Sequence, residues 1–490
     1  MNWFILGIYG LALTFVLLYS VVQIHLVILY LRNRKTKKEQ LPKLLDKEWP
    51  LVTIQLPLYN ELYVTKRLIE NIALIDYPQD KLEIQVLDDS TDKTTDIVRK
   101  TIADLGIRGN HIKLVRRPRR EGYKAGALKY GMRKMTGEFV AIFDADFLPK
   151  PDFLRVTIPY LVRNAQLGVV QTRWGHINKD YNLLTKCQAF GLDAHFIVEQ
   201  SGRNFGGHFI NFNGTGGVWR KKCIEDAGHW QADTLTEDLD LSYRAQLKGW
   251  KFKYLEDITA PAELPITMNA LKSQQFRWTK GAAENTIKNL SRVLKSNLPL
   301  STKTHSFFHL MNSAIFLCIL ICSFLSVPIL LIKVNHIEFN LLFKLASVFI
   351  ISLLFLMIFY GVTYFKDRKF TVLKLFRFLV AFPIFLAMSM GLGIHNTIAV
   401  IEGLLGKKSP FVRTPKFNIA EEGKNWTQNI YRITNIGLVT YLEGLSALYF
   451  LFGVLLSIHL KDYTMIYLET ILFFGYSGVF FYSVKHSTAN

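Results

Sequence analysis

The first 31 residues contain no Lys, Arg, Asp or Glu, and Arg32 then opens a basic block. A helix of this length, at roughly 1.5 Å per residue, is long enough to cross a hydrocarbon core of about 30 Å. No basic segment precedes the run and no small-residue cleavage site follows it, which argues against a secretory signal peptide. Residues 1–31 are therefore predicted to form a transmembrane helix.

Apolar runs of similar length return only after a long interval. Between Val52 and about Leu300 no stretch could span a bilayer. Candidate spans then lie at roughly 307–332, 345–365, 378–401, 433–460 and 463–484. Half of all residues are hydrophobic, which excludes intrinsic disorder. The formal net charge of +20 alone would suit a nucleic-acid binder, but the uncharged runs favour a membrane protein with no nucleic-acid partner.

Basic residues predict which side of the membrane each segment faces, because Lys and Arg are retained on the cytoplasmic side. Segments 32–50, 366–377 and 406–432 carry seven, five and six of them, whereas 333–344 and 461–462 carry two and one. The N-terminus is thus expected outside, and the long central region is expected in the cytoplasm. We expect a multi-pass protein of the plasma (inner) membrane, or of a Golgi membrane if the chain is eukaryotic.

One candidate span does not fit a simple alternation. Both flanks of 378–401 are basic, yet a single crossing would separate them, and 24 residues are too few for two crossings. Gly391 and Gly393 lie in its second half, so we predict a re-entrant hairpin buried among other helices. A single crossing with an unusually basic outer loop is the alternative. Two acidic residues, Glu443 and Glu469, lie within or near the last spans, where they mark either a polar path or a headgroup interface.

The cytoplasmic region alternates strands and helices. Val52-Thr-Ile-Gln-Leu-Pro-Leu, Leu82-Glu-Ile-Gln-Val-Leu, Ile112-Lys-Leu-Val and Phe139-Val-Ala-Ile-Phe are predicted strands with helical segments between them. This order predicts an α/β, Rossmann-like domain with a mostly parallel sheet covered on both faces. Pro57, Asp88 and Asp144 follow three of the strands. They are expected at one sheet edge, where such sheets bind ligands.

The carboxylates at that edge suggest a metal site. Asp144 and Asp146 are separated by one residue just beyond a buried strand, and Asp88-Asp89 follows another. Two carboxylates there are suitable ligands for a hard divalent cation, which would neutralise a diphosphate leaving group. A lone Asp-x-Asp is a weak signal, and the buried strand before it makes this one a candidate site.

Three other positions each admit a functional and a structural interpretation. Lys124, at a helix start, is either an anion-binding residue or a surface lysine. Glu237 and Asp238, after Thr236, are either helix-capping acids or include a general base for a sugar hydroxyl. Gln274-Gln-Phe-Arg277-Trp278 either binds a diphosphate and a sugar or marks a membrane interface.

Together these motifs resemble the processive glycosyltransferases of family 2, which include cellulose, chitin and hyaluronan synthases. Asp88-Asp89-Ser, Asp144-Ala-Asp146, Thr-Glu-Asp238 and Gln274-x-x-Arg277-Trp278 occur in the order seen in that family. The similarity is greatest to plant cellulose-synthase-like group A mannan and glucomannan synthases and their bacterial relatives. The segments that show this similarity include Gln85-Val-Leu-Asp-Asp-Ser-Thr-Asp, Gly122-Tyr-Lys-Ala-Gly-Ala-Leu-Lys and Phe212-Asn-Gly-Thr-Gly-Gly-Val-Trp-Arg. It covers roughly residues 50–300, and the membrane part by layout only.

The resemblance implies a GT-A catalytic domain that binds Mg²⁺ or Mn²⁺ and inverts the configuration of the sugar. Asp238 would be the general base, beside Glu237. The implied nucleotide and donor contacts are Pro57, Glu61, Asp88, Asp89, Lys124 and Asp144. Asp144 and Asp146 would handle the metal, and the implied contacts to the acceptor and pyrophosphate are Gln274, Arg277, Trp278 and Trp174.

A later segment resembles the gating loop of cellulose synthases. Phe411-Val-Arg413-Thr414-Pro-Lys416 is similar to a Phe-x-Val-Thr-x-Lys pattern that covers the bound nucleotide, although Arg413 and Pro415 depart from it. A lid over the nucleotide is the implied role, with its cations able to reach a diphosphate. The resemblance also agrees with a cytoplasmic position for 406–432.

These interpretations divide the chain into predicted parts. They are a transmembrane helix (1–31), a basic cytoplasmic linker (32–50), a GT-A domain (51–264), interfacial amphipathic helices (265–304), and a C-terminal transmembrane region (305–490) with four spanning helices, the hairpin 378–401 and the loop 406–432.

The expected function is a membrane β-glycan synthase that uses GDP-mannose or UDP-glucose, elongates a glycan and passes it through its own helices. A non-processive enzyme that glycosylates ceramide or a polyprenyl phosphate is the first alternative. A transporter or channel with a regulatory domain is the second, and it leaves the acidic strand ends unexplained. Membrane lipid is an expected partner in each case.

Overall fold

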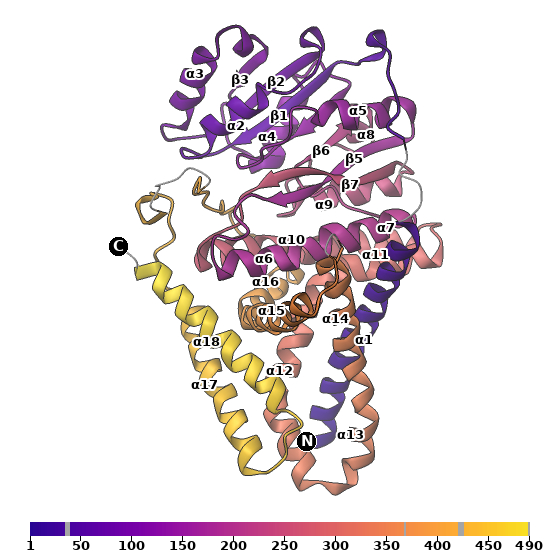
Figure 1. Cartoon of the computed structure of the whole chain (residues 1–490), viewed down its shortest axis with the longest axis vertical. Helices are drawn as coiled ribbons and strands as arrows, with labels where there is room; N and C mark the ends of the chain where they lie inside the picture. The colour runs from indigo at the N-terminus through magenta and orange to yellow at the C-terminus, as the bar shows by residue number, and fades with distance from the viewer. Residues whose placement is uncertain (35–39, 367–368, 420–425, 489–490) are drawn as a thin grey trace.

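The computed structural model describes residues 1–34, 40–366, 369–419 and 426–488. A sheet domain occupies one end of the molecule and a set of long helices the other, with a layer of helices lying across the junction (Figure 1). The predicted separation into a sheet domain and a helical part is thus visible in the fold.

The sheet has seven strands in the order β3-β2-β1-β4-β6-β5-β7. The strands are β1 (Val52–Leu58), β2 (Leu82–Asp88), β3 (Ile112–Val115), β4 (Phe139–Ile142), β5 (Leu167–His176), β6 (Gly217–Arg220) and β7 (Lys251–Ala262). The four predicted strands are β1 to β4, which pair in parallel. β6 runs antiparallel to both β4 and β5, so the sheet is mixed, with an antiparallel strand in the middle that was not predicted.

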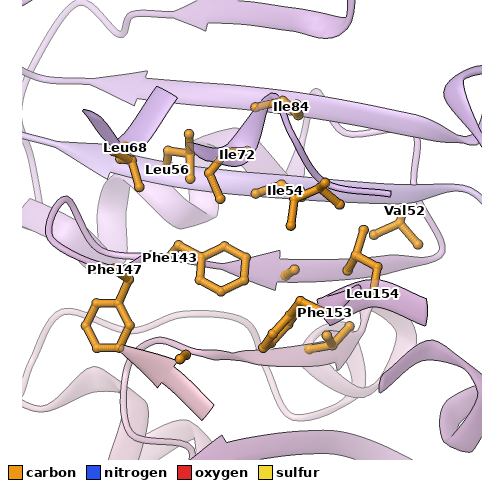
Figure 2. Packing of buried hydrophobic residues seen from close by; sticks show 14 of the residues in the cluster. Val52, Ile54, Leu56, Leu68, Ile72, Ile84, Phe143, Phe147, Phe153 and Leu154 are labelled. Atoms are coloured by element: carbon orange, nitrogen blue, oxygen red, sulfur yellow. The ribbon is translucent and has the colours of Figure 1, made fainter. Parts of the chain in front are cut away.

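Helices cover both faces of this sheet, as predicted (Figure 1). They are α2 (Thr65–Ile72), α3 (Thr94–Asp104), α4 (Tyr123–Met132), α5 (Phe153–Arg163), α8 (Lys221–Asp226) and α9 (Glu237–Leu247). On one face Ile54 and Leu56 of β1 pack with Leu68 of α2 and with Phe143 and Phe153 (Figure 2). Each such side chain contributes about 1.5–3 kcal/mol when fully buried, so this core holds the strand ends in place.

A layer of helices lies between the sheet and the long helices. It comprises α6 (Leu183–Ala194), α7 (Gln200–Phe205), α10 (Met268–Lys295) and α11 (Leu300–Leu310). In Figure 1, α6 and α10 run across the molecule directly below the sheet. The sequence predicted interfacial helices over 265–304, which α10 and the start of α11 occupy. The crossing helix α6 was not predicted.

Among the described residues, five helical stretches are long and apolar enough to cross a membrane. They are Asn2–Asn33, Leu300–Asn335, Ile337–Tyr364, Val372–Gly391 and Leu438–His459. The individual helices here are α1 (Asn2–Asn33), α12 (Ala314–Asn335), α13 (Asn340–Ala346), α14 (Ile350–Tyr364), α15 (Val372–Gly391), α16 (Gly393–Leu404), α17 (Leu438–His459) and α18 (Ile466–Thr488). α18 corresponds to the predicted span 463–484 but is not among the five, and it runs beside α17 (Figure 1).

The predicted hairpin over 378–401 is two helices, α15 and α16, separated at Leu392. A Cβ on Gly391 would lie 2.4 Å from the carbonyl oxygen of Gly475 in α18, so only glycine permits this close helix contact. The pair lies just below α6 and α10 in Figure 1, whereas α12 and α17 extend to the far end. That arrangement suits a re-entrant segment, which stays a prediction.

The two acidic residues near the last spans are fully buried between helices. Glu443 of α17 accepts a 2.5 Å hydrogen bond from Lys272 Nζ of α10. Glu469 of α18 accepts one of 3.0 Å from Ser457 Oγ of α17. Burial inside the bundle suits the polar-path interpretation better than the headgroup interpretation.

Candidate active site

The carboxyl ends of β1, β2 and β4 meet at one cavity, as the sequence predicted. Of the predicted site residues, all but Asp88 line it: Pro57, Glu61, Asp89, Lys124, Asp144, Asp146, Trp174, Glu237, Asp238, Gln274, Arg277, Trp278, Phe411, Arg413, Thr414 and Lys416. They come from the sheet domain, from α10 and from the segment between α16 and α17. Parallel strands explain why residues so distant in sequence converge here.

Asp88 has a different position from its neighbour Asp89. Its carboxylate is buried and accepts hydrogen bonds from Ser90 N (2.9 Å) and Thr95 Oγ1 (2.5 Å), which fix the turn after β2. Asp89 lines the cavity. Its carboxylate oxygens accept hydrogen bonds from Arg117 Nε at 2.8 Å and from Arg117 Nη2 at 2.6 Å. Asp89 therefore lines the cavity, paired with Arg117, and Asp88 supports the loop that carries it.

Lys124 and Asp144 form the centre of the acidic edge. Lys124 Nζ donates to Asp144 Oδ1 at 2.5 Å and to the carbonyl oxygen of Gly214 at 2.9 Å. Burial alone would lower the pKa of Lys124, but the charges of Asp144, Glu237 and Asp238 outweigh it and raise the pKa. Lys124 is a charged residue of the cavity and not a surface lysine.

The residues of this edge fit a hard divalent cation. Asp146 is 1% exposed, and its Oδ1 has no hydrogen-bond partner among the described residues. Its Oδ2 accepts from Lys416 Nζ at 2.8 Å and from Glu263 N at 3.3 Å. A buried carboxylate oxygen without a partner, two residues from Asp144, is the type of ligand that Mg²⁺ and Mn²⁺ prefer.

Asp238 lies near Lys124, at the start of α9. A Cβ on Gly214, whose φ is +80°, would lie 2.9 Å from Asp238 Oδ2 and 3.5 Å from Lys124 Nζ. The glycine therefore makes room for both side chains. Burial and then the negative charge of Glu237 raise the pKa of Asp238, and burial raises that of Glu237. A raised carboxyl pKa in a cavity is the property expected of a general base.

α10 supplies cationic and aromatic groups to the same cavity. The guanidinium of Arg277 lies 4.7 Å from the ring centroid of Phe411. Trp278 and Trp174 have ring centroids 6.2 Å apart, and Trp174 donates from Nε1 to the carbonyl oxygen of Thr215 at 3.4 Å. The two indoles line the same cavity as the carboxylates and can offer apolar faces to a sugar.

The predicted lid lies over the acidic edge. Arg413 Nη1 is 2.6 Å from Glu61 Oε2, Lys416 contacts Asp146 as above, and Phe411 stacks on Tyr123 at 5.8 Å. Burial raises the pKa of Glu61 to about 7, although Arg413 opposes the shift. Of the predicted loop 406–432, residues 420–425 lie outside the described residues. Arg413, which departs from the family pattern, thus contacts the site.

The lid is attached to α10 on both sides. Before it, Lys280 Nζ of α10 donates to Glu402 Oε2 of α16 at 2.9 Å. After it, Lys272 of α10 contacts Glu443 of α17. The pair of Lys272 with Glu443 is buried, whereas in the other pair Lys280 is buried and Glu402 is 18% exposed.

Sequence reasoning missed several residues of the cavity, namely Tyr59, Arg120, Tyr123, His176, Asn213 and Glu263. The guanidinium of Arg120 lies 3.4 Å above the ring of Tyr59 and 4.9 Å from that of Tyr123. Arg120 lies in a run of arginines after β3, which could have indicated an anion site. Glu263 follows β7, a strand that was not predicted, so its position gave no signal.

A second cavity adjoins the first. It is lined from α6, α10, α12, α14 and α15 by residues that include Gln275, Phe316, Tyr360, Phe385 and Ser389. Leu192 and Gln274 line both cavities. Leu192 and Gln274 therefore lie between the active-site cavity and a space between helices of the membrane part.

The chain is similar to proteins of one enzyme family. Residues 50–281 match the model of a family described as glycosyltransferase-like family 2. A probable glucomannan 4-beta-mannosyltransferase 4 of Oryza sativa subsp. japonica is 47% identical over 252 residues, which are 51% of this chain and 46% of that protein. Glucomannan 4-beta-mannosyltransferase 9 of Arabidopsis thaliana is 42% identical over 295 residues, which are 57% and 55%. The chain thus spans about half the length of these relatives.

A solved structure has the same fold. The mannosyltransferase PcManGT from Pyrobaculum calidifontis, in complex with GDP-Man and Mn²⁺, matches with a TM-score of 0.54 and 20% identity. The match covers 82% of this chain and all of that one. With the mixed sheet described above, it confirms the predicted GT-A fold.

Proposed function

Because residues 50–281 match the model of a family described as glycosyltransferase-like family 2, we propose that the chain is an inverting hexosyltransferase that extends a β-linked glycan. The observation that carries this proposal is Asp238 beside the Lys124–Asp144 pair in one cavity. A general base and a cationic diphosphate site are there within reach of one substrate. The names of the relatives favour mannose as the sugar and GDP-mannose as the donor, with UDP-glucose second.

In the transfer step the acceptor hydroxyl oxygen attacks the anomeric carbon of the donor. Asp238 takes the hydroxyl proton as the new C–O bond forms. The bond from the anomeric carbon to the diphosphate breaks, and the nucleoside diphosphate leaves with the bonding electrons. A single displacement turns an α-linked donor into a β-glycoside.

The leaving diphosphate gathers negative charge, which the cationic residues of the cavity stabilise. Lys124, Arg277 and Lys416 are the cations that we assign to this role, and Asp89 and Glu61 are assigned to the donor. Asp144 and Asp146 would hold Mg²⁺ or Mn²⁺, which as a Lewis acid would neutralise the diphosphate.

We assign the acceptor end of the glycan to Trp174, Trp278 and Gln274. Both indoles line the active-site cavity, and Gln274 lies between this cavity and the space between the membrane helices. The adjacency of the two cavities supports a processive enzyme, whose product leaves through that space, over one that glycosylates a lipid. We propose that the sheet domain lies on the cytoplasmic side, because the basic segments next to the apolar helices favour that orientation.

Full-length protein in detergent, supplied with Mn²⁺ and labelled GDP-mannose or UDP-glucose, tests the proposal. We expect incorporation from GDP-mannose into a large product that an endo-β-1,4-mannanase digests. A single sugar in the lipid fraction would contradict the polymer product and support the glycolipid alternative. Loss of all incorporation with both donors, despite donor binding, would contradict the enzyme assignment.

A further inference from the structure

Three histidines meet far from the active-site cavity, where α1, α7 and α11 come together (Figure 1). His25 belongs to α1, His305 to α11, and His208 follows α7. One ring nitrogen from each lies within 4.8 Å of the other two. His25 Nδ1 is 2.8 Å from His305 Nε2, and the rings of His208 and His305 stack with centroids 3.9 Å apart.

These rings present the atoms that a transition metal needs. In the contact between His25 and His305 one nitrogen donates and the other accepts, so the accepting ring has an unprotonated nitrogen. His305 is 4% exposed and His208 is 8% exposed. His305 Nδ1 has no hydrogen-bond partner among the described residues. A buried polar atom without a partner is costly, so the packing leaves this ring incompletely satisfied.

Contacts with neighbouring residues account for only part of the way the three histidines are arranged. His208 Nδ1 lies 3.3 Å from Thr302 Oγ1, which provides that nitrogen with a partner. A Cβ on Gly206 would lie 2.8 Å from His208 Nε2, so the backbone leaves room for the ring only because residue 206 is glycine. The nearest buried cation, Arg203, donates to the carbonyl oxygen of His305 at 3.1 Å and pairs with Glu199 at 2.9 Å. Glu199 thus compensates the charge that would otherwise oppose a metal ion.

We propose that His25, His208 and His305 bind a first-row transition-metal dication, with Zn²⁺ as the ion to test. Imidazole nitrogen is a preferred ligand for such ions, and three histidines leave a fourth position for water. The bound ion would tie the first membrane helix to α11 and to the sheet domain.

The experiment uses full-length protein with a tag that contains no histidine. The background variant is Asp146→Asn, so that the carboxylates of the active site do not contribute to binding. The protein is stripped with a chelator, loaded with Zn²⁺, separated from free ion and analysed by elemental mass spectrometry. We expect about one ion per chain, and an affinity at least about tenfold lower in His25→Gln and in His208→Gln.

The matched control is His309→Gln, which changes another buried histidine on α11, one turn from His305. This variant should bind Zn²⁺ as the parent does. Equal binding by the parent, His25→Gln and His208→Gln would overturn the proposal, as would clearly less than one retained ion in the parent. Because position 25 is exposed, His25→Gln tests the site even if His208→Gln does not fold. Zn²⁺ should also raise the thermal midpoint of the parent and not that of His25→Gln.

Discussion

The two walls of the active-site cavity are built in different ways. One wall is acidic and comes from the sheet domain, where Glu61, Asp144 and Asp146 follow strands held in register by the core. The other is basic and comes from α10 and the lid, with Arg277, Arg413 and Lys416. Ion pairs cross between the walls, from Arg413 to Glu61 at 2.6 Å and from Lys416 to Asp146 at 2.8 Å.

The difference shows how the site depends on the membrane part. Strand pairing alone fixes the acidic wall, because its residues lie at the ends of neighbouring strands. The basic wall is not fixed by strand pairing and is positioned by the helices α10, α16 and α17. A site suited to a diphosphate is therefore complete only when the sheet domain and the long helices are docked. Four substitutions test this division of roles.

Asp238→Asn removes the proposed base beside the acidic wall and should have the largest effect. We expect a fall in kcat of about 10³-fold with little change in donor affinity, because a general base contributes about 10² to 10⁴ in rate. Turnover of labelled donor and donor calorimetry measure the two quantities. Asp233→Asn, five residues earlier and paired with Lys288 at 2.7 Å, is the control and should stay active.

Arg277→Lys tests the basic wall. Lysine keeps the charge but loses the planar fork that contacts two phosphate oxygens at once. Loss of a charge-assisted hydrogen bond costs about 1.5–3 kcal/mol, so kcat/KM should fall roughly 10- to 100-fold. Arg292→Lys, exposed on the same helix, should behave as the parent. Unchanged kinetics in Arg277→Lys would show that the guanidinium does not bind the diphosphate.

Lys416→Met breaks one pair between the walls and leaves the carboxylate of Asp146 free. The donor KM should rise about tenfold as a charged contact to the diphosphate is lost. Affinity for Mn²⁺ without nucleotide should rise, since lysine no longer competes for Asp146. Titration of Mn²⁺ by its paramagnetic signal measures the second effect. Lys407→Met, whose side chain is 66% exposed, is the control, and equal Mn²⁺ affinity in both variants would refute the competition.

Glu237→Gln should have the smallest effect, a shift in pH dependence. Burial and the charge of Glu237 raise the pKa of Asp238 above its ordinary value. The base must be ionised, so kcat/KM falls as the pH falls through this raised pKa. Removing the neighbouring charge lowers the pKa of Asp238 and should move the acid limb to lower pH by about one unit. A pH profile of initial rates measures this shift of the acid limb. The exposed Glu225→Gln is the control and should show no shift.

The sequence predicted the strands of the first half of the sheet but not those of the second. β1 and β4 are short apolar runs buried on both faces, which gives a clear signal. β7 is only partly buried and contains Lys251, Glu256, Asp257 and Pro261, so its sequence has no clear strand pattern. β6 has only four residues. Its antiparallel direction depends on tertiary packing, which no local pattern reports.

Site residues could be predicted where a residue of suitable chemistry follows the end of a predicted strand. Asp144 and Asp146 follow from the pattern of the first four strands, whereas Lys124, Asp238 and Arg277 had two interpretations each until resemblance to a family implied their roles. The position of Asp88 was not predictable, because two adjacent aspartates at a strand end look alike until hydrogen bonds to Ser90 and Thr95 distinguish them. The contact between Arg413 and Glu61 joins residues more than 300 positions apart and has no sequence signal.

The two ion pairs on α10 make the lid a closed loop. Lys280 and Lys272 are eight residues apart on one helix, so the two attachment points are separated by roughly 12 Å along its axis. The entropy lost in closing such a loop depends only weakly on its length, about 0.6 kcal/mol for each doubling. Added loop residues would therefore cost little stability, and the lid can diverge in length as long as Arg413 and Lys416 keep their contacts with the site.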